Sequence, residues 1–147
     1  MSQNNEIRRE IRIKAAPATV FALLTDAQKM RQWLAPIVEA DPTPGGTFRA
    51  SHPGGVWIEG TYLETITNRK VVFTWGGIHG IGPGQSMVEF LLEPDGDHTL
   101  LKLRHYRLPP SALEAHHRGW VVSGLPKLQK VAVGHEPGEP CLAHMRG

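Results

Sequence analysis

The chain has 147 residues, which is the size of one domain able to bury a substantial core. Hydrophobic residues make up 40% and charged residues 20%, and this balance excludes an intrinsically disordered chain. The formal net charge is only +2, and lysine and arginine alternate with acidic residues, so we expect no nucleic-acid partner.

The first predicted elements are a strand and two short helices. Residues 7–14 alternate in part between apolar and polar, which predicts a strand. A helix follows from Pro17, because proline is tolerated in the first helical turn, where its missing N–H has no partner anyway. Asp26 has the residue type of an N-cap for a second helix over residues 27–34, which Pro36 ends.

A series of strands comes next. Strands are predicted over residues 37–41, 47–52, 56–66, 70–75, 86–93 and 99–106. The sixteen glycines and twelve prolines supply the turns between them, and consecutive antiparallel strands with short turns form a meander. The glycine-rich segment 76–85 is predicted to be a hairpin loop at the mouth of a cavity, a candidate lid. It is no phosphate-binding loop, because it lacks the Lys-Ser/Thr pair and joins two strands.

The last predicted element is a long helix that follows Pro110 and runs to about Val133. Ser111 and Glu114 have the spacing of a capping box at its start. Pro126 lies inside the helix and predicts a kink, because proline cannot donate the hydrogen bond that a helix interior needs.

One domain is therefore predicted over residues 1–133, followed by a flexible C-terminal tail, 134–147. The single cysteine, Cys141, lies in this tail and excludes an internal disulfide and a cysteine metal cluster. No apolar run approaches the roughly 20 residues of a membrane span. The polar N-terminus lacks the apolar core of a secretory signal, so we expect a cytoplasmic protein.

The order of elements predicts an α+β fold: a curved antiparallel sheet of about six or seven strands wrapped around the long C-terminal helix, with two short helices after the first strand. Short segments spread over about residues 7 to 131 resemble a known family. They are residues 13–17, 20–21, 24–26, 45–49, 60–64, 71–75 and 99–105, with Trp33 and Gly119-Trp120. In this order they resemble the Bet v 1-like, START-related helix-grip proteins of the SRPBCC superfamily. Within it they are similar to the branch named after the C-terminal domain of the Hsp90 ATPase activator.

The resemblance implies a helix-grip fold with a hydrophobic cavity between the sheet and the C-terminal helix. Members of the superfamily bind lipids, polyketides or hormones, and a few are cyclases or hydrolases. Pro126 and the Pro/Gly-rich tail depart from the family pattern at the lower end of the expected cavity.

Candidate ligand-binding residues are the side chains expected to face this cavity. They are Phe48, Tyr62, Phe73, Trp75, Phe90, Leu103, His105, Leu113, His117 and Trp120. The alternative, left open for each ring, is that it only fills the core. Trp57 is in the opposite phase from Tyr62, which favours the outer face of the sheet.

Two histidine positions are the candidates for chemistry. His105 lies in the inward phase of the last strand, and either His116 or His117, one turn before Trp120, is expected to face it; His117 is the candidate. Such a pair would orient a polar ligand group or act as general acid and base, and the alternative is a structural hydrogen bond. We expect no metal, because no third ligand is marked by spacing, and no cofactor.

Three functions remain open. The sequence favours binding of a small apolar ligand that is lipid-, polyketide- or aromatic-like, because it carries no catalytic signature. A cyclase or hydrolase with His105 and His117 as acid and base is the second hypothesis. A chaperone-cofactor module acting on an Hsp90-type partner is the third, and it follows from the family analogy alone. An exposed face of the sheet leaves a homodimer open.

Overall fold

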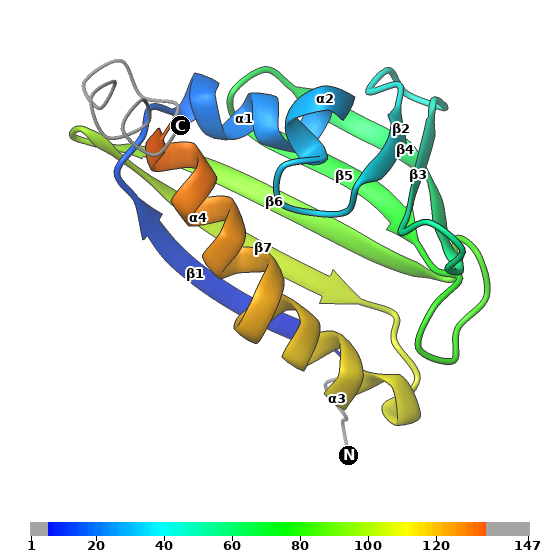
Figure 1. Ribbon diagram of the computed structural model, residues 1–147. Coiled ribbons are helices and arrows are strands. Elements are labelled where there is room, and N and C mark those ends of the chain that lie inside the picture. The colour runs from blue at the N-terminus through cyan, green and yellow to red at the C-terminus, as the bar shows by residue number, and fades with distance from the viewer. Residues whose placement is uncertain (1–5, 135–147) are drawn as a thin grey trace.

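The computed structural model describes residues 6–134, in which a curved antiparallel sheet carries its helices on one face (Figure 1). The elements are β1 (Ile7–Ile13), α1 (Pro17–Thr25), α2 (Ala27–Met30), β2 (Ile37–Ala40), β3 (Thr47–Ser51), β4 (Trp57–Ile66), β5 (Lys70–Trp75), β6 (Ser86–Asp95), β7 (His98–Tyr106), α3 (Pro110–Arg118), η1 (Gly119–Gly124) and α4 (Leu125–Gly134). The seven strands follow the order β1-β7-β6-β5-β4-β3-β2. The predicted α+β helix-grip architecture is confirmed.

The core lies between the sheet and the helices. Along β6 and β7 buried residues alternate with half-buried ones, because successive side chains of a strand point to opposite faces. Val88, Phe90 and Leu92 of β6 therefore face the helices, as do Leu101 and Leu103 of β7. Phe90 and Leu103, which the sequence predicted to face inward, are among them.

Helices α1 and α2 are fixed to the rest of the molecule by side-chain hydrogen bonds to backbone carbonyls. Asp26 caps α2 by accepting the backbone N–H of Gln28 at 2.9 Å. The indole of Trp33 donates to the carbonyl of Leu23 at 2.7 Å. The hydroxyl of Tyr62 donates to the carbonyl of Leu24 at 3.1 Å, which ties α1 to the sheet.

Helix α2 is shorter than the predicted segment 27–34, because the chain turns after Met30.

The sheet bends where β4 meets β5. A Cβ atom on Gly60 would lie 1.8 Å from the carbonyl oxygen of Thr74, so only glycine permits this approach. The Thr74 hydroxyl accepts the backbone N–H of Thr61 at 2.8 Å, and the register shifts between Tyr62 and Glu64. This bend gives the sheet its curvature over the helices.

The C-terminal helix crosses the inner face of the sheet (Figure 1) and changes its winding on the way. It begins at Pro110 with Pro109 as N-cap and no side-chain cap, so the predicted capping box is wrong. Proline already has the φ angle that the first turn needs, and Ser111 lies inside the helix.

Residues Gly119–Gly124 form a π-helix, in which the backbone N–H of Leu125 donates to the carbonyl of Trp120, five residues back. The predicted helix therefore continues through Pro126, with the wider turn directly before it, and the kink expected at this proline stays a prediction. A π-helical turn in an α-helix is frequent at functional sites.

No helix within residues 6–134 is long and apolar enough to cross a membrane. The predicted tail 134–147, with Cys141, lies outside the described residues except for Gly134, which ends α4.

We expect Gly60→Ala to lower the free energy of unfolding by about 2 kcal/mol or more, because the added methyl group would displace the β5 backbone. Gly119→Ala is the matched control. A Cβ at Gly119 meets nothing within 4 Å and its backbone is helical, so this change is expected to raise stability by about 0.5–1 kcal/mol. Urea denaturation of both variants checks this, and equal stabilities would contradict the role assigned to Gly60.

Candidate functional site

A chain of buried hydrogen bonds runs from the C-terminal helix through His105 to β5. The indole N–H of Trp120 donates to Nδ1 of His105 at 3.0 Å. Nε2 of His105 lies 2.8 Å from the hydroxyl of Ser86, which donates to the carbonyl of Trp75 at 2.7 Å. Since an indole nitrogen can only donate, Nδ1 of His105 must be the acceptor. Nε2 of His105 therefore carries the ring proton and donates a hydrogen bond to the hydroxyl oxygen of Ser86.

His105 is therefore neutral and fully occupied by protein groups. Burial, with a smaller contribution from the neighbouring His116, lowers its pKa to about 3. Neither ring nitrogen is left to touch a ligand, so His105 joins the helix to the sheet and does not supply an acid or a base in this structure.

The helix histidine that faces the sheet is His116, not His117. The ring of His116 is buried and lies edge-on to that of His105, with the ring centres 5.0 Å apart, whereas His117 is exposed. His116 lies four residues before Trp120 and so shares its side of the helix. The expected pair of His105 and His117 does not form, which removes the acid–base pair of the enzyme hypothesis.

One nitrogen of His116 has no partner. Its Nδ1 lies 2.9 Å from the carbonyl oxygen of Ala112 and must donate to it, so Nε2 is a buried acceptor that has no hydrogen-bond partner. Burial lowers the pKa of His116; the Ala112 bond acts in the opposite direction, and His79 adds to the lowering. The imidazole is therefore held in its neutral form near neutral pH.

A second buried group is also left without a partner, the indole N–H of Trp75. An unsatisfied buried donor or acceptor costs about 1–3 kcal/mol, and most such groups in native proteins are paired. Both Trp75 and His116 line the same pocket, although the unpaired nitrogen of each is itself covered by protein atoms.

This hollow, the indole pocket, has a volume of about 230 Å³. It is lined by Trp33, Leu34, His52, Trp75, Ile78, His79, His116, Gly119, Trp120, Ser123 and Gly124. The indoles of Trp33, Trp75 and Trp120 are each at most 5% exposed and form its floor. His52, His79 and Ser123 are exposed and form its rim, so the pocket is reached from solvent.

The π-helix shapes the wall of the indole pocket. Four of its six residues line the hollow: Gly119, Trp120, Ser123 and Gly124. A Cβ on Gly124 would lie 3.2 Å from the ring of Trp120, so glycine leaves the indole room to lie flat against the helix. The wider turn and the two glycines together keep space that a regular helix with larger side chains would fill.

The loop after β5 forms the opposite wall. Ile78 and His79 belong to the glycine-rich segment 76–85, which forms a loop as predicted. His79 has a φ of 52°, a backbone conformation that non-glycine residues rarely adopt, and its ring lies edge-on to His116 with the ring centres 5.0 Å apart. Its position at the pocket mouth fits the predicted lid, which stays a prediction.

The residues that the sequence predicted to bind a ligand lie in different parts of the structure. Of the predicted ligand-binding residues, Trp75 and Trp120 line the indole pocket. Phe48, Tyr62, Phe73 and Phe90 line no described pocket, because they pack on one another in the core, with the Phe48 and Phe73 ring centres 4.7 Å apart. Leu113 is partly buried against the core. Trp57 lies on the outer face beneath the guanidinium of Arg49, as its phase indicated.

Sequence reasoning missed most of the pocket. It did not select Trp33, Leu34, His52, Ile78, His79, His116, Gly119, Ser123 or Gly124. The spacing of four between Ala112, His116 and Trp120 was the available signal for His116, because such residues share a helix face. The loop 76–85 was expected at the mouth of a cavity, but nothing local in the sequence places the turn after α2, with Trp33 and Leu34, beside that face.

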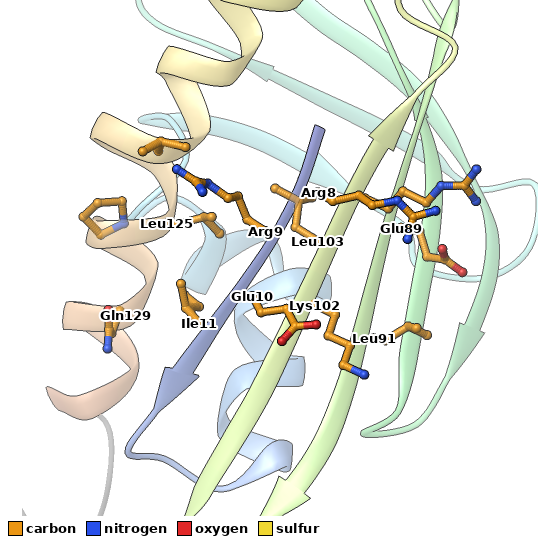
Figure 2. Close-up of a pocket in the computed structure, with 13 residues that line it drawn as sticks. Arg8, Arg9, Glu10, Ile11, Glu89, Leu91, Lys102, Leu103, Leu125 and Gln129 are labelled. Atoms are coloured by element: carbon orange, nitrogen blue, oxygen red, sulfur yellow. The ribbon is translucent and has the colours of Figure 1, made fainter. Parts of the chain in front are cut away.

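A larger and more charged hollow of about 520 Å³, the edge groove, lies along β1 (Figure 2). It is lined by Arg8, Arg9, Glu10, Ile11, Glu89, Leu91, Lys102, Leu103, Arg104, Val121, Leu125, Pro126 and Gln129. In Figure 2, Arg9 and Ile11 point from β1 toward the helix that carries Leu125. Within residues 6–134, Arg9 makes no ion pair and no unpaired buried group lines this groove. The edge groove is larger, but the indole pocket is the better-built site.

Metal ligands are not gathered anywhere in the described part of the chain: no group of three or more His, Cys, Asp or Glu side chains is placed to hold an ion.

The chain is similar to known proteins in sequence and in fold. Residues 14–132 match the family described as Activator of Hsp90 ATPase homolog 1-like protein. No curated protein matches the chain. Among solved structures, an AHSA1-like protein from Rhizobium etli is 35% identical, with a TM-score of 0.70 over 94% of this chain and 88% of that one.

Two further solved structures share the fold. An Hsp90 activator from Plasmodium falciparum is 25% identical, with a TM-score of 0.74 over 86% of this chain and 94% of that one. A protein from Mesorhizobium loti is 22% identical, with a TM-score of 0.79 over 89% of this chain and 98% of that one.

The neutral, buried His105 predicts that the protein loses stability on acidification. The unfolded chain takes up a proton on this histidine below about pH 6.5, whereas the folded protein does so only near pH 3. Between these values the unfolded state binds more protons, so the free energy of unfolding falls by up to about 1.4 kcal/mol per pH unit, and the effect vanishes above pH 6.5.

Urea denaturation from about pH 7 to 5 measures this slope in a range where carboxylates contribute little. His105→Gln removes the titrating ring and is expected to flatten the slope, while His117→Gln, at an exposed position, is expected to keep it. A wild-type slope in the His105→Gln variant would contradict the assignment.

Proposed function

The chain belongs to the family of Activator of Hsp90 ATPase homolog 1-like proteins, and we propose that it binds a small apolar molecule of aromatic character in the indole pocket. The observation that carries the proposal is a hollow, open to solvent at its rim, whose floor consists of three buried indoles. Ligand sites are concave and mostly apolar, with a few polar groups that orient the ligand.

The size of the pocket narrows the ligand from the three classes that the sequence left open. An apolar cavity of about 150 Å³ accepts benzene, so about 230 Å³ suits one substituted ring. A lipid chain or a folded polyketide needs more room. The core rings Phe48, Tyr62, Phe73 and Phe90 occupy the space under the sheet that a larger ligand would require. Flat rings also pack well against indoles, in offset or edge-on contacts.

Access to the pocket supports binding from solvent. Its rim includes the exposed side chain of His79, on a loop that carries five glycines between residues 76 and 85. We infer that this loop moves to admit the ligand and then covers it, as a lid does.

The test uses a side chain that fills the pocket. A Cβ on Gly119 meets nothing within 4 Å and this residue lines the hollow, so Gly119→Leu is expected to block binding without a clash in the protein. Gly134→Leu, also in open space but at the end of α4, is the matched control. Titration with toluene, followed by tryptophan fluorescence, is expected to saturate in the wild type and the control and to weaken at least tenfold in Gly119→Leu.

Equal toluene affinity in the wild type and Gly119→Leu would place binding elsewhere, and the absence of any saturable change would count against the proposal. Native mass spectrometry of freshly purified protein, against the same sample denatured, would identify a molecule that is already held.

A second candidate is an interaction with an Hsp90-type chaperone. It is favoured by the likeness to the Hsp90 activator from Plasmodium falciparum and by the edge groove, where Arg9 presents a charge that makes no ion pair within residues 6–134. A cation next to the apolar Ile11 and Leu125 is a suitable contact for an acidic partner surface.

If this candidate holds, the protein raises the ATPase rate of a purified Hsp90, and Arg9→Glu abolishes the increase. Lys14→Glu, an exposed change outside the groove, is the control and is expected to keep the increase. An unchanged ATPase rate with the wild-type protein removes the candidate.

The homodimer that the sequence leaves open and the cytoplasmic location that it predicts are both untested. The molar mass from light scattering would test the first, and fractionation of the source cells the second.

A further inference from the structure

We propose that the free edge of β1 binds an extended, acidic segment of a partner protein as an additional strand of the sheet. This segment carries an apolar and an acidic side chain two residues apart, and both lie in the edge groove. The inference concerns the surface invoked for the second candidate function. It depends neither on an Hsp90-type partner nor on a ligand in the indole pocket.

The backbone of the β6–β7 hairpin shows which groups of the sheet are already bonded. β1 is the outermost strand and, within residues 6–134, pairs with β7 alone (Figure 1). Asp95 and His98 flank a two-residue turn and so exchange hydrogen bonds, and bonded and non-bonded pairs alternate along an antiparallel ladder. Pro94 has no N–H and accordingly falls in the non-bonded pair with Thr99.

The same alternation, carried across β7, assigns the backbone of β1. Residues 99, 101, 103 and 105 of β7 bond to β1, so the odd-numbered residues of β1 are the bonded ones. The backbone groups of Arg8, Glu10 and Arg12 therefore point away from the sheet. An independent contact agrees, because Nε2 of Gln129 donates to the carbonyl of Arg12 at 3.1 Å. Both groups of Arg8 and Glu10, and the N–H of Arg12, have no hydrogen-bond partner in the part of the chain that the structure describes.

The edge groove gives an added strand space for its side chains. Because side chains alternate along a strand, Arg8 and Glu10 face the outside of the sheet, whereas Arg9 and Ile11 point toward the helix that carries Leu125 (Figure 2). The inner side chains of a strand added beside β1 enter the same hollow. Recognition by strand addition combines main-chain hydrogen bonds with pockets for alternate side chains, and both are present at this edge.

Arg9 selects an acidic side chain. It is the one charged residue at the inward positions of β1, where the other three residues are isoleucines, and it makes no ion pair within residues 6–134. The outward-facing Arg8 and Arg12 are already paired with Glu6 and Asp95. A carboxylate opposite Arg9 completes the unpaired charge, and an aliphatic side chain opposite the next inward residue meets the apolar wall of the groove.

A second copy of this chain is a poorer occupant of the edge. When two β1 strands pair antiparallel, two of the central registers set Arg9 opposite Arg9 or Glu10 opposite Glu10, and like charges directly opposite destabilise a sheet. The register that sets Ile11 opposite Ile11 requires the carbonyl of Arg12, which already accepts from Gln129. An acidic strand from another protein avoids both conflicts.

Synthetic peptides test the mode of binding. A strand antiparallel to β1 meets Ile11 before Arg9, so the probe is the fluorescein-labelled peptide Thr-Thr-Leu-Thr-Glu-Thr-Thr. Fluorescence anisotropy is expected to show saturable binding to the wild-type protein. Replacing the glutamate of the peptide by lysine is expected to weaken binding at least tenfold, because it sets two cations opposite each other.

N-methylation of the peptide tests the main-chain bonds. The central threonine lies opposite Glu10 and directs its N–H at β1, so methylating this nitrogen is expected to abolish binding. The N–H of the leucine points away from β1, and its methylation is the matched control, which is expected to keep the affinity. Equal effects of the two methyl groups would overturn the proposal, because the peptide would then not be bound as a strand.

Variants of the protein test the role of Arg9. Arg9→Glu is expected to reverse the preference, so that the lysine peptide binds more tightly than the glutamate peptide. Lys14→Glu, exposed and outside the groove, is the control and is expected to keep the wild-type preference. Arg9→Ile is expected to weaken binding of the glutamate peptide.

The remaining outcomes contradict the proposal in distinct ways. Tighter peptide binding or self-association of Arg9→Ile would show that Arg9 keeps other strands off this edge, as inward-pointing charges on edge strands do. Failure of every peptide to bind overturns the inference and leaves the indole pocket untouched. A failed ATPase experiment with Hsp90 removes that partner alone, since the peptide measurements contain no chaperone.

Discussion

The hydrogen bond from the indole of Trp120 to His105 joins the C-terminal helix to the last strand, and the pocket depends on it. It fixes which nitrogen of His105 carries the proton, and through Ser86 it extends to the backbone of β5 at Trp75. Because these groups satisfy one another, the polar chain stays in the core without unpaired atoms of its own. The rings of Trp75 and His116 pack against His105 and also line the hollow.

The interior shows why a helix-grip fold does not by itself imply a large cavity. Four aromatic side chains from β3, β4, β5 and β6 fill the space below α1 and α2, and the hydroxyl of Tyr62 is bound to the carbonyl of Leu24. What remains open is a small hollow between the middle of the C-terminal helix, the turn after α2 and the loop after β5. Its shape comes from local backbone features, the π-helix and the glycines, and not from the architecture of the sheet.

The fold could be predicted from the sequence because strand alternation and turn residues are local signals. The alternation of apolar and polar residues places Val88, Phe90 and Leu92 on one face of their strand, and all three are buried. The site could be predicted only in part. His105 and Trp120 were found by phase, but His117 was chosen over His116, although the spacing of four residues from His116 to Trp120 places these two on one helix face. The contribution of the loop through His79 depends on tertiary packing, which periodicity does not report.

The π-helix has a consequence for how this pocket could change among related chains. Buried residues of the C-terminal helix step through Ala112, His116, Trp120, Leu125, Leu128 and Ala132. Every step is three or four residues except the five from Trp120 to Leu125, as though one residue had been inserted there. Each residue turns an α-helix by about 100°. Deleting one residue would therefore rotate either the half that carries Leu125 or the half that carries His116 away from the sheet. The chemistry of the pocket is therefore tied to helix length, and a single codon gained or lost near Ser123 would remodel it more than most substitutions.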